Sequence, residues 1–163
     1  DSAVTAAKAG FDPGKIGQVI QTYKTDTFST SSTSFVDVTG LSVSITPSAT
    51  TSKILISLTA TIAQGTAGWN LYTQLLRDST VVGSSTGGTS GQLFAGSLFA
   101  GNAYVEQIAG NYLDSPSTTS ATTYKIQGRA DTRTSNVEMR FLYQSNNIPG
   151  DPNMSLIAQE IVG

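Results

Sequence analysis

The stretch SKILISLTATI, residues 52–62, alternates apolar side chains with mostly hydroxyl-bearing ones at a period of two. One set of alternate positions is wholly apolar: Ile54, Ile56, Leu58, Ala60 and Ile62. The other set is Leu55, Ser57, Thr59 and Thr61. Because successive side chains of a strand point to opposite faces, this pattern predicts a strand with one buried face and one hydroxyl-rich face.

The same alternation continues along most of the chain. It predicts strands within residues 16–23, 34–40, 41–47, 53–62, 69–83, 115–130, 137–144 and 155–163, with a tight connection at Arg77–Thr80 and a loop over residues 25–33. Turn signals recur roughly every 8–12 residues, and no helix long enough for a parallel β-α-β unit is visible. The expected fold is therefore all-β: an antiparallel β-sandwich, jelly-roll-like, of roughly eight to ten strands.

Residues 1–15 differ in pattern from the rest of the chain. The segment VTAAKA favours a helix but is short, and Gly10, Pro13 and Gly14 end it. We expect an arm or tether over residues 1–15 that requires a partner to become ordered, with Val4 and Phe11 as its candidate assembly contacts. The length of 163 residues suits one domain, which we place at residues 16–163.

Composition limits the chemistry that is available. The chain contains no cysteine and no histidine, so disulfides, thiol catalysis and histidine-based catalysis or metal binding are excluded. Charged residues make up 12% of the chain, about half the usual share, and the net charge is -2. Without a basic stripe or a long apolar run, we expect neither nucleic-acid binding nor membrane insertion.

The remaining chemical candidates are weak. The acidic residues stand singly and suit turns or the surface, no G-x-S-x-G motif is present, and we expect no cofactor and no catalytic residue. Asn146, Asn147 and Asp151 lie in a loop that could offer oxygens to calcium, but its spacing is not that of an EF-hand. A hairpin turn is the better interpretation, because Pro149-Gly150 is itself a turn signal.

Aromatic residues are candidates for ligand contact. Trp69 shares its strand face with Leu71, Thr73 and Leu75, which favours the core. Tyr72 falls on the opposite face, so we expect it to be exposed. The candidate ligand-facing residues are therefore Tyr72, Asn146, Asn147 and Asp151.

Three segments, in this order, resemble a recurring domain of bacteriophage structural proteins: KTDTFSTSSTSFVDVTGLSVSITPSATTSKILISLTATI, LLRDSTVVG and LDSPSTTSATTYKIQGRA. That domain belongs to tail fibres and virion appendages of marine and cyanobacterial phages. The resemblance covers about residues 17–130; segment 84–110 departs from it. It implies an exterior virion part, often trimeric, with no catalytic residues to transfer. The strand pattern is also similar, at the level of fold, to C1q/TNF-type jelly rolls.

The sequence supports three hypotheses about function. The first is a tail-fibre or appendage domain, outside the phage particle, that attaches to a host-surface glycan or protein through loops at strand ends. The second is a capsid decoration (cement or head-fibre) protein that stabilises the shell, with residues 1–15 lying across it. The third, more remote, is a polysaccharide-cleaving enzyme. A low-charge exterior also favours a homo-oligomer, most readily a trimer, because symmetry places each charge near its own copies.

Overall fold

The computed structural model describes residues 15–64, 70–83, 94–97, 105–130, 139–141 and 154–163. These residues form strands only: β1 (Lys15–Lys24), β2 (Phe28–Thr30), β3 (Val36–Ile45), β4 (Lys53–Gln64), β5 (Asn70–Arg77), β6 (Thr80–Val82), β7 (Phe94–Ser97), β8 (Val105–Asp114), β9 (Thr122–Ala130), β10 (Met139–Phe141) and β11 (Met154–Val162). Within them, no helix is long and apolar enough to cross a membrane.

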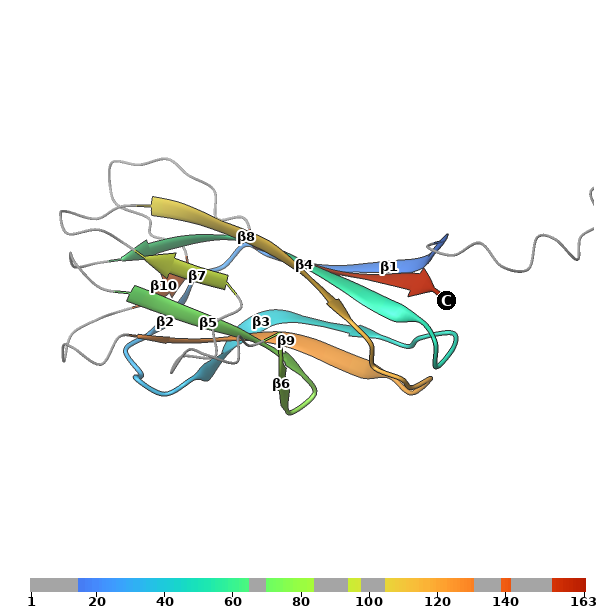
Figure 1. Cartoon of the computed structure of the whole chain (residues 1–163). Helices are drawn as coiled ribbons and strands as arrows, with labels where there is room; N and C mark the ends of the chain where they lie inside the picture. Colours follow the sequence, from blue (N-terminus) through green and yellow to red (C-terminus); the bar gives the residue numbers. More distant parts are fainter. Residues whose placement is uncertain (1–14, 65–69, 84–93, 98–104, 131–138, 142–153) are drawn as a thin grey trace, which may run out of the picture.

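The strands form two antiparallel sheets that lie one above the other (Figure 1). Sheet A contains β1, β11, β4 and β8, with β10 and β2 continuing the positions of β11 and β1. Ala63 pairs with β8 on one edge of β4 and with β10 on the other, so β10 shares an edge with β11. Sheet B contains β3, β9 and β5, and both β6 and β7 pair with the outer edge of β5. Each sheet is thus four strand positions wide.

The order of these positions defines the topology. Numbered along the chain, the eight positions run 1-8-3-6 in sheet A and 2-7-4-5 in sheet B. This is the arrangement of a jelly roll, in which two Greek keys fold over one core. The predicted all-β, jelly-roll-like sandwich is therefore confirmed, and the three-residue strands account for the larger number of segments.

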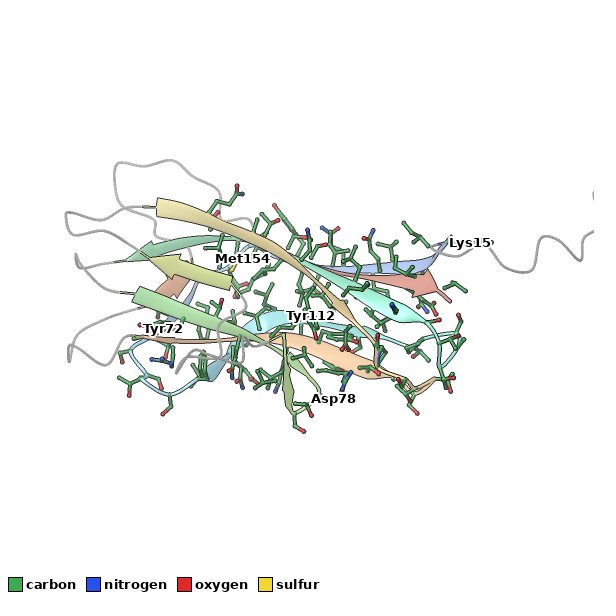
Figure 2. All side chains as sticks on the ribbon, in the orientation of Figure 1. Lys15, Tyr72, Asp78, Tyr112 and Met154 are labelled. Carbon is green, nitrogen blue, oxygen red and sulfur yellow. The ribbon has the colours of Figure 1, made fainter. Side chains whose placement is uncertain are left out.

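Alternation along the strands builds the core. In β4, Ile54, Ile56, Leu58 and Ala60 are buried, as the pattern of residues 52–62 predicts. They join the buried apolar side chains of sheet B and of the strands that flank β4 in sheet A: Val38, Leu41, Val43, Ile45, Leu75, Val82, Ile108, Tyr124, Ile126, Met154, Leu156 and Ala158. Tyr112 packs against this cluster and lies between the sheets in Figure 2. One shared core therefore holds both sheets together.

Local expectations differ from the structure along β3, at β2, and at β7 and β8, which lie outside the ranges expected as strands. The segments expected as separate strands over 34–40 and 41–47 form the single strand β3, whose pairing with β9 shifts between Asp37 and Ser42. Gly40 lies in this irregularity with φ +80°, a conformation that glycine adopts without strain. The hydroxyl-rich connection expected over 25–33 contains the short strand β2, because β10 offers it a pairing partner distant in sequence.

Two buried carboxylates fasten the sandwich, contrary to the expected turn or surface roles. Asp114, at the end of β8, accepts two hydrogen bonds from Arg77 Nη1 of the facing sheet, at 3.0 and 2.9 Å. The hydroxyl of Tyr124 donates to Asp114 Oδ2 at 2.7 Å. Burial, and then this bond to an anion, raise the pKa of Tyr124, so its hydroxyl remains a donor. Asp114 therefore clasps sheet A to sheet B.

Glu160 performs a similar task two strands away from Asp114, with Ile54 between them in the register. Its side chain is 1% exposed. Oε1 accepts the amide N–H and the hydroxyl of Ser48, each at 2.6 Å, and Oε2 accepts Gln18 Nε2 at 2.8 Å. Burial alone would raise the pKa of this carboxyl, but the hydrogen bonds from Ser48 and Gln18 favour the anion more strongly and lower the pKa to about 2. Glu160 thus ties the β3–β4 turn to β1 and β11.

Candidate interaction surface

The outer face of sheet B carries rows of polar and aromatic side chains across three strands. Outer positions of β9 alternate with buried ones, so residues 123, 125, 127 and 129 point away from the core. The pairing register places Tyr72 opposite Arg129 and Gln74 opposite Gln127 on one side, and Asp37 opposite Gln127 on the other. Side chains that lie directly opposite one another on adjacent strands are close enough to be in contact.

The first row is an aromatic–cation stack. The guanidinium carbon of Arg129 lies 4.1 Å from the ring centroid of Tyr72 and 5.2 Å from that of Phe35. Phe35 immediately precedes β3, where the register brings it next to Arg129. Both distances lie within the range in which a ring attracts a cation. The arginine is therefore held in one orientation, and its Nη1 donates to the carbonyl of Ala130 at 3.2 Å.

The second row is a hydrogen-bonded network. Asp37 accepts a bond from Gln127 Nε2 at 2.6 Å and forms an ion pair with Lys125 Nζ at 2.8 Å. Gln74 Nε2 donates to Gln127 Oε1 at 2.6 Å. The ammonium of Lys125, and then the amide of Gln127, hold the pKa of Asp37 below its usual value. These contacts fix the side chains that border the stack.

Together the two rows make a pre-arranged polar surface. It presents a guanidinium and a side-chain amide, which can contact hydroxyl and carboxylate groups such as those of sugars, beside two aromatic rings. Tyr72 lies on the outer face, as expected, but it is half-buried, because Arg129 covers its ring. Figure 2 places Tyr72 near the end of sheet B opposite to the end at which Lys15 lies.

Sequence reasoning missed Arg129 and Phe35 as members of this surface. Their signal is only positional: Arg129 alternates with buried Gly128 and Ala130, and Phe35 precedes a strand. Without the register between β3, β9 and β5, nothing connects them to Tyr72. The other expected contacts, Asn146, Asn147, Asp151, Val4 and Phe11, lie outside the described residues, as does Trp69.

The acidic side chains that the structure describes are already engaged. Asp114 and Glu160 fasten the core, and Asp37 pairs with Lys125. Asp26 pairs with Lys24 at 2.8 Å, and Asp78 Oδ1 accepts the backbone N–H of Thr123 at 2.9 Å. Among the described residues, no three acidic side chains come together as metal ligands.

Comparisons with known proteins give likenesses to solved structures. No model of a known protein family matches the chain, and no curated protein matches its sequence. A solved structure of infectious bursal disease virus, Gx strain, is similar to it in shape, with 16% sequence identity and a TM-score of 0.45. The alignment covers 94% of this chain and 40% of the viral one, so this chain spans well under half of that protein's length.

Proposed function

We propose that the chain is a non-enzymatic structural domain of a bacteriophage virion, part of a trimeric tail fibre or appendage on the outside of the particle that attaches to a host-surface glycan. The observation that carries this proposal is the Arg129 guanidinium stacked between Tyr72 and Phe35 on the outer face of sheet B. Pre-ordered arginine and aromatic side chains suit recognition without chemistry, because little side-chain freedom remains to be lost on binding.

The scaffold supports the same conclusion. Jelly rolls serve as capsid and lectin domains, although the fold alone does not specify a function. The ordered resemblance to phage appendage domains points to a virion, and the low share of charged residues suits assembly of identical subunits.

Among the described residues, the two buried carboxylates argue against a glycosidase. Such an enzyme requires two carboxyl groups about 5–10 Å apart, one of which holds a proton near neutral pH. Glu160 has a pKa of about 2 and is enclosed by its donors, and Asp114 is paired with Arg77. At neutral pH Glu160 therefore has no proton to donate to a sugar, and Asp114 is held by Arg77 and Tyr124.

The attachment role can be tested by competition. Purified protein added to host cells should reduce phage adsorption, and Tyr72→Ala and Arg129→Ala should each weaken that competition by about tenfold, the equivalent of about 1.4 kcal/mol. Ser42→Ala, an exposed position on the same sheet face, is the matched control and should compete like the wild type. Full competition by both stack variants would contradict a binding role for this surface.

The location can be tested by electron microscopy of intact particles. Density for this chain in a fibre or tail appendage is the expected result. Density on the capsid shell would contradict the attachment role and would instead indicate a capsid decoration protein. In a separate assay, release of reducing ends from host polysaccharide by the protein would contradict the non-enzymatic role.

A further inference from the structure

The outer face of sheet A differs in kind from that of sheet B. Among the described residues, the large apolar side chains that are most exposed are Ile16, Val19, Tyr23, Leu113 and Val81, at 51%, 54%, 55%, 49% and 41%. All except Val81 belong to β1 and β8, the two edge strands of sheet A. Exposed apolar groups that gather on one face mark an interaction surface rather than scattered surface residues.

The pairing register shows that these side chains share one face. Val19 lies opposite Gln159, Gln159 opposite Leu55, and Leu55 opposite Leu113, so one row crosses all four strands. Ile16 lies opposite Ile161, and Gln21 opposite Ile157. The residues facing outward with them are half-buried or exposed and mostly uncharged: Leu55, Ser57, Thr59, Gln107, Ala109, Asn111, Ser155, Ile157, Gln159 and Ile161.

Charge separates the two faces. Among the described outward-facing positions of β1, β11, β4 and β8, Lys53 is the one charged side chain. The outer face of sheet B carries Asp37, Lys125 and Arg129. Interface centres are depleted of charge and enriched in tyrosine and apolar residues. The sheet A face shares the low charge, and its apolar side chains alternate with serine, threonine, glutamine and asparagine.

The size of this face matches a subunit contact. Four strand positions about 4.8 Å apart give a width of about 19 Å, and strands of 10 residues at about 3.3 Å each give a length of about 33 Å. The footprint is about 600 Å², whereas a specific interface buries about 600–1,000 Å² per partner.

We infer that the outer face of sheet A is the surface through which copies of this chain associate. A second copy is the fitting occupant because symmetric association would bring each charged group near its own duplicate, and this face offers almost none to repel. A partner selected by electrostatics would need charges to meet, and those lie on sheet B. This inference rests on the proposed multimeric virion role and names the contact that role requires.

The test places charges at the two edges of the face. Val19→Lys and Leu113→Lys replace side chains that are about half exposed, so the fold should tolerate them, as checked by circular dichroism and thermal melting. Native mass spectrometry and light scattering should show a wild-type oligomer at micromolar concentration. Each substitution should raise the protein concentration at which the oligomer dissociates by tenfold or more. Val81→Lys, the matched exposed position on sheet B, should leave the oligomer intact.

A second measurement does not depend on the variants folding well. A photo-crosslinking residue at position 113 should yield linked subunits, and one at position 81 should not. A monomeric wild type overturns the inference, as does an oligomer that persists unchanged in both lysine variants or crosslinks only from position 81. These measurements use the isolated protein, so an oligomer that stays intact in the variants would contradict the sheet A contact but not the proposed function. Absence of the chain from virions would contradict the proposed function but not the contact.

Discussion

Replacing Glu160 with glutamine should remove the main acid-sensitive anchor of the sandwich. The substitution keeps the shape of the side chain but removes the charge that Ser48 and Gln18 stabilise. It also turns an amide NH₂ toward one of those donors, because Glu160 accepts hydrogen bonds at both oxygens. The variant thus isolates the contribution of the ionised carboxylate.

The expected loss can be worked out from the pKa. The pKa falls from the usual 4.5 to about 2 in the folded protein, and at about 1.4 kcal/mol per pKa unit this corresponds to about 3 kcal/mol of folding free energy. Three charge-assisted hydrogen bonds replaced by neutral or repulsive contacts imply a similar loss. At pH 7, Glu160→Gln should therefore be less stable by about 2–3 kcal/mol, which lowers Tm by roughly 5–10 °C.

The sign of the pH dependence is also fixed. A carboxyl whose pKa is lower in the folded state contributes its full stability above about pH 4.5, and loses it as pH falls toward 2. The difference in the free energy of unfolding between wild type and Glu160→Gln should therefore be constant from pH 7 to about pH 5, and it should become smaller at pH 4 and pH 3. The comparison cancels the contributions of Asp26 and Asp37, whose pKa values are also lowered.

Urea unfolding at several pH values measures this difference. Ser48→Ala is the control: it removes the hydroxyl bond but leaves the amide N–H and the charge, so its loss of stability should be about 1 kcal/mol. A loss below about 0.5 kcal/mol for Glu160→Gln at pH 7, or a gap that does not narrow in acid, would refute the reasoning.

The remaining predictions concern the clasp and the irregularity in β3. Tyr124→Phe keeps the ring but loses one bond to Asp114, so the free energy of unfolding should fall by about 1–2 kcal/mol. Asp114→Ala also leaves Arg77 without its carboxylate partner, so it should lower the free energy of unfolding by about 3 kcal/mol or more. Equal losses for the Tyr124 and Asp114 variants in urea unfolding would contradict the role of Asp114 in joining the sheets. Gly40→Ala should lower Tm through backbone strain of about 1–2 kcal/mol, because its new Cβ would meet only the Lys24 side chain at 3.6 Å. Gly40→Asn should be milder, since asparagine adopts positive φ more readily, and an unchanged Tm for alanine would show that the bend can relax.

The fold could be predicted because alternation is a local signal. Leu41, Ile56 and Tyr124 are buried at positions that a period of two assigns to the inner face. The length of β3 was not predictable, since Gly40 looks like a strand end until pairing with β9 bridges it. The short strand β2 escaped for a related reason: its partner, β10, is more than a hundred residues away in the sequence.

The surfaces were harder to predict than the core. Tyr72 could be assigned to an outer face, but Arg129 and Phe35 meet it only through the registers of two strand pairs. Asp114 and Glu160 read as isolated acidic residues, and their partners come from other strands or turns. A carboxylate can be buried only where the tertiary structure places hydrogen-bond donors around it. Those donors come from distant parts of the sequence, so no local pattern predicts them.

The adjacency of β1 and β11 has a mechanical consequence. Lys15 pairs with Val162, so the described chain enters and leaves the sandwich at one corner, as Figure 1 also shows. Tension between these two residues would break the β1–β11 hydrogen bonds one after another, beginning at that pair, instead of loading all of them at once in shear. A pulling experiment should therefore record a lower rupture force between residues 15 and 162 than between residues 24 and 162, where the load runs along the strands.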